Sequence, residues 1–376
     1  MKETDTSLHI AEPDKRKKNI RGRKLTSLSA NGTDKKLRNL SDFELQQHLL
    51  DGVSRTFALT IPQLPDELHY TVSNAYLLCR IVDTIEDEPE LSSADKKHFC
   101  DFFNNVVADY KNAEKFAAEM SAVLSRNTSP AEHELIALTG HVVQITHRFS
   151  KPQRKALERC VKIMSEGMIY FQENSSPEGL SDIKEMDKYC YHVAGVVGEM
   201  LTELFCLHSP EIAKNKDKLM NLSVSFGQGL QMTNILKDLW EDAEVSACWL
   251  PKSVFDERGF SLNNLKKKQS TEEFQDGIKF LIGITNSHLE RALEYTLLIP
   301  AEEKGIRQFC LWAIGMAVLT IRKIYKNIDY TEGSRVKISR NSVKSTILFT
   351  NMAVKNDFLL KTFFNIARAG LPYQKA

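Results

Sequence analysis

Helical periodicity that continues from Ser41 almost to the end of the chain is the feature that most constrains the fold. Apolar residues recur at three- and four-residue spacing in long segments. The 376 residues include only 17 glycines and 11 prolines, the residues that most often break helices and build hairpin turns. We therefore predict an all-α protein. The predicted helices cover residues 71–86, 94–110, 133–149, 153–171, 188–207, 218–241, 271–298 and 307–327.

The first 38 residues differ from the rest of the chain. Seven of the ten residues from Lys15 to Lys24 are basic, and hardly any apolar residue is available for burial. This composition is typical of a disordered, solvated tail. The alternative is attraction of residues 15–24 to anionic lipid. No repeat or linker divides the remainder, so we predict one domain over residues 39–360 and a frayed end over 361–376.

Charge and cysteine content exclude several classes of protein. The 50 Lys and Arg residues nearly balance the 49 Asp and Glu residues, which argues against a nucleic-acid-binding protein. The seven cysteines form no CxxC pair and lie mostly in apolar segments, so we expect reduced, buried thiols. The first residues are polar, and no uncharged apolar run reaches the roughly 18–20 residues that span a bilayer. We therefore expect a cytoplasmic protein without a transmembrane helix.

A first acidic cluster lies within a predicted helix, directly after an apolar stretch. Asp83, Glu86 and Asp87 stand at i, i+3 and i+4, so their carboxylates share one helix face. Most clusters of this kind are simply solvated helix surfaces, and that interpretation remains open for this one alone. The basic residues Arg55, which follows Ser54, and Arg80 precede it; Arg80 lies one turn earlier on the same face. Such cations form ordinary ion pairs or bind an anionic leaving group.

A second cluster, about 150 residues later, repeats the pattern. Asn234, Asp238 and Asp242 recur every four residues along one helix face, with Glu241 beside them. Like charges at this spacing destabilise a helix unless a cation lies between them. Mg²⁺ commonly binds one or two carboxylates together with substrate phosphates. Two such clusters on facing helices predict a site for a diphosphate held through Mg²⁺.

The segment 189–198 reads as a helix although it contains Gly195 and Gly198. Glycine costs about 1 kcal/mol relative to alanine in a helix interior, so a local reason is needed. One interpretation is close packing against another helix. The other is space for a long apolar chain lying against bare backbone. The segment 226–231, with two further glycines, repeats the feature just before the second acidic cluster.

The segments SRTF, RIVDTIED, YCYHVAGVVG and QMTNILKDLWED occur in this order and resemble the squalene/phytoene synthase family of head-to-head prenyl transferases. The likeness extends from about residue 54 to about residue 350. Phe309-Cys310 with GMAVLTI, and the later Val336-Lys337-Ile338, resemble squalene synthases more than carotenoid-type relatives. The resemblance implies an isoprenoid-synthase fold, a single-domain helical bundle around a central apolar channel, with residues 39–360 as the catalytic domain.

The resemblance also implies a reaction. Two farnesyl diphosphates would be condensed to presqualene diphosphate, which NADPH then reduces to squalene, with Mg²⁺ as the metal. An alternative is a dehydrosqualene- or phytoene-type synthase, or one that stops at presqualene diphosphate, without the reductive step. A third is a catalytically dead relative that acts as an assembly factor. For such an apolar product, we expect peripheral contact with an anionic membrane at its cytoplasmic face, through residues 15–24.

Carried over motif by motif, the resemblance gives each residue a role. The expected Mg²⁺ ligands are Asp83, Glu86 and Asp87 for one diphosphate and Asn234, Asp238 and Asp242 for the other. The expected diphosphate-binding residues are Ser54, Arg55 and Arg80. The expected catalytic residues are Arg80, Tyr76 and Tyr189. The phenols of the two tyrosines would flank the reacting carbons. Further substrate-binding residues are Gln231, Val193 and Gly198. The expected NADPH-binding residues are Lys337 and Arg340.

One segment departs from the family pattern. Many relatives place an arginine shortly before an aromatic-Leu-Pro turn, whereas this chain reads Ala247-Cys248-Trp249-Leu250-Pro251. We expect Lys252 or Arg258 to supply the missing charge.

Overall fold

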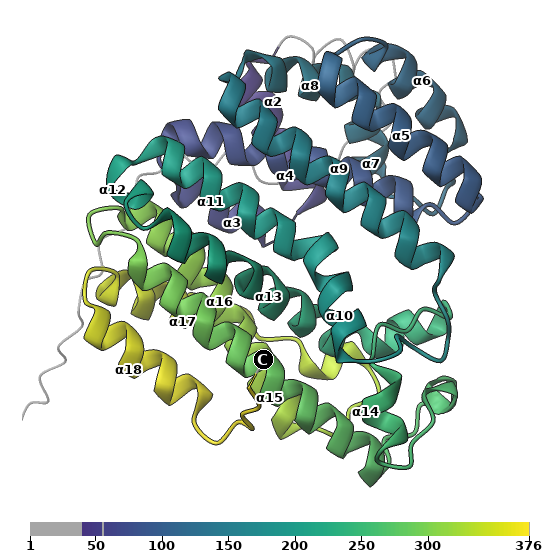
Figure 1. Ribbon diagram of the computed structural model, residues 1–376, viewed down its shortest axis with the longest axis vertical. Coiled ribbons are helices and arrows are strands. Elements are labelled where there is room, and N and C mark those ends of the chain that lie inside the picture. Colours follow the sequence, from purple (N-terminus) through teal and green to yellow (C-terminus); the bar gives the residue numbers. More distant parts are fainter. Residues whose placement is uncertain (1–39, 55, 376) are drawn as a thin grey trace, which may run out of the picture. The chain divides into compact units, whose positions relative to one another are not determined.

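The computed structural model describes residues 40–54 and 56–375, and a compact helical unit begins at Asp42. Arg55 and the basic segment 15–24 lie outside the described residues. Every regular element of the described chain is a helix, and the single β-bridge joins Leu180 to Pro251 (Figure 1). The all-α prediction is confirmed. The cysteine prediction also holds, because all seven thiols are free and all except Cys206 are buried.

The first half of the unit carries the first acidic cluster at the end of a long helix. Its helices are α2 (Asp42–Val53), α3 (Phe57–Thr60), η2 (Ile61–Gln63), α4 (Asp66–Asp87), α5 (Ser93–Asp109), α6 (Ala113–Val123), α7 (Pro130–Ala137), α8 (Thr139–Arg148) and α9 (Lys151–Glu173). The helix predicted over 133–149 is in fact two helices, broken at Leu138. Gly140 allows the break to pack closely, since a Cβ there would lie 2.2 Å from an oxygen of Glu114 on α6.

The second half is arranged around α13, which carries the second acidic cluster. Its helices are α10 (Ile183–Cys190), η3 (Tyr191–Gly195), α11 (Val196–His208), α12 (Pro210–Ala213), α13 (Lys216–Glu244), α14 (Lys252–Asp256), η4 (Leu262–Lys267), α15 (Glu272–Leu298), α16 (Lys304–Lys326), η5 (Gly333–Val336), α17 (Arg340–Ala353) and α18 (Asp357–Arg368). Helix α13 packs against α11, η3, α15 and α16. It therefore forms the centre of this half.

Glycines bring α13 and its neighbours into backbone contact. A Cβ on Gly198 would lie 2.3 Å from the Ser223 carbonyl oxygen, and one on Gly227 would lie 2.3 Å from the Ala194 carbonyl oxygen. The structure thus supports the close-packing interpretation of these glycines. Between α10 and α11, the turn η3 is a π-helix, a widened turn that often occurs at functional sites.

The fold continues past residue 360, where we predicted the domain to end. Helix α18 runs to Arg368 because Leu360 and Phe364 are buried in the core cluster. Beyond it, the Pro372 carbonyl accepts a 2.8 Å hydrogen bond from Asn286 on α15. The prediction of a frayed end from residue 361 was therefore wrong, because tertiary packing orders a segment whose own sequence signal is weak.

Two segments of the described chain are long and apolar enough, by length and composition alone, to cross a membrane. They are Ile183–His208, which comprises α10, η3 and α11, and Lys304–Lys326, which is α16. Both pack against α13, and 67% of the apolar window of α16 is buried inside the bundle. Core helices of globular proteins have the same length and composition. Neither segment is free of charged residues, and the expectation of a protein without a transmembrane helix stays a prediction.

A buried arginine fixes the last two helices to the bundle. Arg307 on α16 is 2% exposed and donates hydrogen bonds to the carbonyls of Ile299 (2.8 Å) and Val354 (3.0 Å). Its guanidinium also lies 2.7 Å from the Asp357 carboxylate at the start of α18. One side chain therefore joins the end of α15 to the turn between α17 and α18.

We expect Arg307→Met to lower the free energy of unfolding by about 3–5 kcal/mol, because buried carbonyls and Asp357 lose their donor. Arg322→Met is the matched control. Arg322 also lies on α16 and donates to carbonyls of α18, those of Ile366 and Ala367, but at a partly exposed position where water can replace it. The control substitution should lower the free energy of unfolding by less than about 1 kcal/mol. Urea denaturation measures both, and equal losses would contradict the role given to Arg307.

Candidate active site

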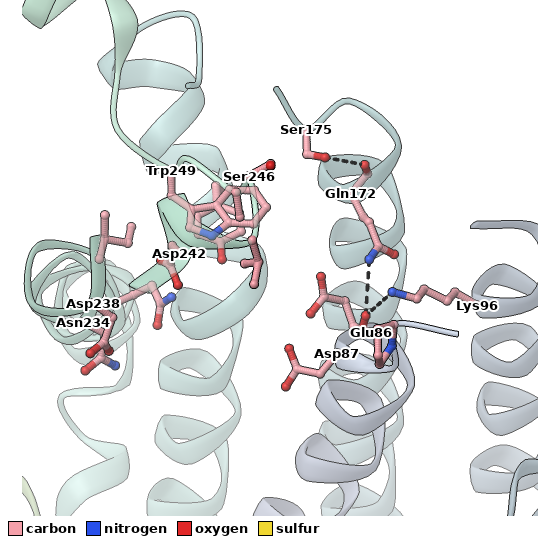
Figure 2. Close-up of a pocket in the computed structure, with 16 residues that line it drawn as sticks. Glu86, Asp87, Lys96, Gln172, Ser175, Asn234, Asp238, Asp242, Ser246 and Trp249 are labelled. Carbon is pink, nitrogen blue, oxygen red and sulfur yellow. Dashed lines mark hydrogen bonds between the residues drawn. The ribbon is translucent and has the colours of Figure 1, made fainter. Parts of the chain in front are cut away.

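The two acidic clusters face each other across one cavity (Figure 2). Glu86 and Asp87 at the end of α4 form one wall, and Asp238 and Asp242 near the end of α13 form the opposite wall. The cavity has a volume of about 500 Å³. Other lining residues come from α5, α9, α10 and the loop after α13: Lys96, Gln172, Ser175, Tyr189, Val245, Ser246, Ala247 and Trp249.

Both clusters lie at the carboxyl ends of long helices. Helix α4 ends at Asp87 and α13 ends at Glu244, and neither has a basic residue in its last turn. The carboxyl end of a helix already carries a partial negative charge, which favours cations and disfavours carboxylates. Each helix therefore adds its own dipole to the negative potential of the cavity.

Burial and mutual repulsion raise the pKa values of these carboxyl groups. The pKa of Asp83 rises to about 7 and that of Glu86 to about 8, in both cases mainly through burial. Burial, and then the neighbouring charges of Asp238 and Glu241, raise the pKa of Asp242 to about 6. The pKa of Asp87 is raised for the same main reason. Such carboxylates gain from a proton or a bound cation.

The donor set fits Mg²⁺ shared with a diphosphate. No three His, Cys, Asp or Glu side chains in the described part of the chain are close enough to enclose a metal ion by themselves. Carboxylate and amide oxygens nevertheless face the cavity from both walls, and Mg²⁺ typically combines one or two carboxylates with water and substrate phosphates. The residues placed to contribute are Glu86, Asp87, Asn234, Asp238 and Asp242.

Asp83 contacts an arginine and does not line the cavity. Its carboxylate lies 3.5 Å from the Arg80 guanidinium, which also forms an ion pair with Glu132 on α7. Glu132 is itself fixed, because it forms a capping box with Ser129 at the start of α7. Sequence reasoning missed Glu132. The spacing Ser129-x-x-Glu132 predicts a helix cap, but it gives no sign of the contact with Arg80.

Two further residues fix the end of α4. Lys96 is 7% exposed, and its Nζ donates to the Glu86 carbonyl, which also accepts a 3.2 Å hydrogen bond from Gln172 (Figure 2). Burial lowers the pKa of Lys96, and the charges of Glu86 and Asp87 oppose that effect. Lys96 supplies positive charge, and Gln172 a neutral hydrogen-bond donor, at the negative end of the helix dipole. Sequence reasoning missed both of them.

Glu88 serves the structure rather than the cavity. It is fully buried and accepts hydrogen bonds from the Ser125 backbone N–H (2.9 Å) and the Thr128 hydroxyl (2.6 Å). These bonds hold its pKa below the usual range despite burial. Glu88 therefore fixes the chain directly after the first acidic cluster.

Ser54 and Tyr76 come together next to Arg80. The Ser54 hydroxyl accepts a 3.0 Å hydrogen bond from the Phe57 N–H, and the Phe57 ring lies 5.1 Å from the Tyr76 ring. The Tyr76 hydroxyl donates to the Val53 carbonyl at 3.4 Å. Burial raises the pKa of Tyr76.

Tyr189 lines the cavity in a stacked aromatic pair. Its ring lies parallel to that of Trp249, with the centroids 4.2 Å apart, and meets Phe171 edge-on. Burial holds the pKa of Tyr189 well above its ordinary value, so the phenol stays protonated. Gln231 also lines the cavity, as predicted. The stacking partner Trp249 was not predicted, although the sequence around it is unusual.

The prediction that Lys252 or Arg258 replaces the family arginine is wrong. Lys252 forms an ion pair with Glu178, and Arg258 lies 4.9 Å from the Phe280 ring; neither lines the cavity. The cation beside the second cluster is Lys237, whose Nζ lies 3.0 Å from the Asp238 carboxylate and 3.1 Å from the Asn234 side-chain oxygen.

The remaining predicted residues lie away from the cavity lining. Val193 packs against the core cluster, and Gly198 faces the backbone of α13. Both cations are exposed: Lys337 lies on the segment between η5 and α17, and Arg340 is the first residue of α17. That segment is nevertheless tied to the second cluster, because Glu241 accepts a 3.0 Å hydrogen bond from the Gly333 N–H.

Comparison with known proteins agrees with this geometry. The squalene/phytoene synthase family model matches residues 50–342, a span that includes both acidic clusters. The chain belongs to the squalene/phytoene synthase family. It is 27% identical over 310 residues to the squalene synthase of Schizosaccharomyces pombe, covering 80% of this chain and 63% of that protein. The squalene synthase of Solanum lycopersicum is 30% identical over 305 residues, which cover 80% of this chain and 68% of that protein. The chain thus matches less than two thirds of the yeast protein.

Solved structures show that the family fold extends over most of the chain. A TcSQS complex with a ligand superposes with a TM-score of 0.71 at 21% identity and covers 89% of this chain and 94% of that chain. A dehydrosqualene synthase with a ligand superposes with a TM-score of 0.63 at 18% identity. The match covers 85% of this chain and 98% of that chain. These likenesses establish the fold of this family member.

We expect Glu132→Gln to weaken binding of inorganic diphosphate in the presence of Mg²⁺ by about tenfold, because Arg80 loses a charged hydrogen-bond partner that positions it. Glu134→Gln is the control, since Glu134 lies on the same helix but pairs with the exposed His48. Isothermal titration calorimetry measures both affinities. Equal affinities for the two variants would show that Glu132 does not position Arg80.

We expect Mg²⁺ with diphosphate to raise the melting temperature more at about pH 8 than at about pH 6, because protons compete for the cavity carboxylates below their raised pKa values. Because the raised pKa values mean that these carboxyl groups bind protons more tightly in the folded state than in the unfolded chain, protonation stabilises the fold. Without ligands, the free energy of unfolding therefore falls as pH rises from about 4 to 8. Differential scanning fluorimetry measures both effects. A ligand-induced shift that is equal at both pH values would contradict the titration.

Proposed function

We propose that this protein condenses two farnesyl diphosphates head to head to presqualene diphosphate and, with NADPH, reduces it to squalene. The observation that carries the proposal is the pair of acidic helix ends facing one cavity of about 500 Å³. The relatives named squalene synthase support this reaction for the family. The substrate, the reductive step and the cofactors are part of the proposal.

The acidic walls and Arg80 would handle the diphosphates. Mg²⁺ bound with diphosphate would neutralise the phosphate charge and make each diphosphate a better leaving group. Arg80 would donate hydrogen bonds to the departing oxygens, and Asp83 and Glu132 fix its guanidinium from two sides. Ser54 lies close enough to Tyr76 to contribute a hydroxyl to the same region.

The aromatic wall would protect and stabilise a carbocation. The faces of Tyr189 and Trp249 present negative π density to a positive charge. Because the pKa of Tyr189 is far above neutrality, its phenol keeps its proton and can donate a hydrogen bond to a leaving oxygen. Burial around Tyr189 also excludes water, which would otherwise capture the cation.

Lys337 and Arg340 are the proposed contacts for the NADPH phosphates. Both are exposed basic residues on the segment that Glu241 holds beside α13. The Tyr330 hydroxyl donates to the Leu236 carbonyl and adds a second contact with α13 just before η5. The location we propose is the cytoplasm, with peripheral contact at the cytoplasmic face of a membrane, because the product is apolar.

A second candidate function is condensation without reduction, giving presqualene diphosphate, dehydrosqualene or a phytoene-type product. The likeness of the fold to that of a dehydrosqualene synthase supports this second candidate. A catalytically dead assembly factor is disfavoured, because carboxylates line both walls of the cavity.

The test is incubation with farnesyl diphosphate and Mg²⁺, with and without NADPH, followed by mass spectrometry of the extracted lipids. We expect squalene only with NADPH. Asp87→Asn and Asp238→Asn should each lower turnover by about 10²-fold or more, because each removes charge stabilisation from the diphosphates. Asp276→Asn is the control, since Asp276 is an exposed α15 residue paired with Lys279.

Lys337→Gln with Arg340→Gln should shift the product towards presqualene diphosphate. Dehydrosqualene regardless of NADPH would favour the second candidate. Full activity of both cavity variants would refute the role of the acidic walls.

A further inference from the structure

The last two helices expose an unusual number of large apolar side chains. Met352 on α17 is 72% exposed and Phe358 on α18 is 76% exposed. We use the term hairpin face for the six exposed apolar residues of these helices: Leu348, Phe349, Met352, Phe358, Leu359 and Ile366. Contiguous apolar surface of this kind marks an interaction site in a folded protein.

The hairpin face is one surface on a fixed support. Only three residues, 354–356, separate α17 from α18, and the rings of Phe349 and Phe363 lie 5.5 Å apart across the two helices. The opposite sides of the helices are buried, and both helices pack against α16. Figure 1 shows α18 at the edge of the helical unit, next to α17.

The charge of this region differs from that of the whole chain. Residues 340–375 contain six basic residues and one acidic residue, whereas the whole chain is nearly balanced. The single acidic residue, Asp357, is paired with Arg307, and Glu290 of α15 pairs with Arg368. Among the described residues, no carboxylate forms an ion pair with the exposed Lys344, Lys355 or Lys361.

We propose that the hairpin face binds the surface of an anionic lipid bilayer. The six apolar side chains enter the boundary between headgroups and acyl chains, and Lys344, Lys355 and Lys361 meet the headgroup phosphates. Amphipathic helices with basic residues beside the apolar face bind membranes in this way. Residues 15–24 are not part of this surface, and its lipid binding is independent of the proposed reaction.

The charge favours lipid over a second copy of the chain. In a twofold-symmetric contact the same patch appears on both subunits, so the three lysines of one copy would approach those of the other. Like charges brought together in this way oppose association. An anionic bilayer instead offers phosphates to every lysine and apolar depth to every exposed side chain.

The experiment is co-sedimentation of the full-length protein with vesicles of phosphatidylcholine alone or with about 30% phosphatidylserine. Two test sets and two control sets of variants are compared. The apolar set is Leu348→Gln, Met352→Gln and Phe358→Gln; the charge set is Lys344→Gln, Lys355→Gln and Lys361→Gln. The control sets are Leu207→Gln, an exposed apolar residue of α11, and the exposed lysines Lys97→Gln, Lys151→Gln and Lys155→Gln.

We expect the wild type to prefer the anionic vesicles, and the apolar and charge sets to lose about tenfold or more in partitioning, while both control sets bind as the wild type does. In a Phe358→Trp variant bound to vesicles, brominated acyl chains should quench the fluorescence of the new tryptophan. Unchanged melting temperatures, measured by circular dichroism, confirm that the variants fold.

Equal binding by the hairpin variants and the wild type would overturn the proposal and place any membrane contact elsewhere, for example at residues 15–24. Absence of wild-type binding to either vesicle would also overturn it. A wild-type dimer that becomes a monomer in the apolar set, without vesicle binding, would instead identify the surface as a subunit interface.

Discussion

Repulsion between two groups of carboxylates, held face to face at the negative ends of α4 and α13, is the constraint on which the rest of the site depends. Burial strengthens this repulsion, as the raised pKa values of Glu86 and Asp242 show. Left alone, the two helix ends would separate or fray. The surrounding structure counters both tendencies, and the stored electrostatic energy is available to bind a positively charged partner.

The neighbouring elements oppose this repulsion mainly by fixing the backbone, while Lys96 and Lys237 add positive charge beside the two clusters. Lys96 and Gln172 both donate to the Glu86 carbonyl in the last turn of α4, and the buried Glu88 fixes the chain that follows. On the other side, Gly198 and Gly227 allow α13 to lie in backbone contact with α11 and η3. The acidic side chains thus remain directed at the cavity while the helices that carry them cannot move apart.

Arginines and aromatics complete the site through contacts between distant parts of the chain. Arg80 is held by Glu132, which lies 52 residues later, and the Tyr189 ring is covered by Trp249 from the loop after α13. Neither partner belongs to an acidic cluster or to a glycine-bearing segment. Position in the fold, and not local pattern, makes these two side chains part of the site.

The sequence by itself determined the all-α class, the long helices and the placement of Asp87 and Asp238 on their helix faces, because helical periodicity and i, i+4 spacing are local properties. It did not determine that Glu132 pairs with Arg80, that Lys252 pairs with Glu178, or that α18 is ordered. Those outcomes depend on which surfaces meet when the helices pack, and burial and charge there come from residues far away in the sequence. Only the tertiary structure could decide them.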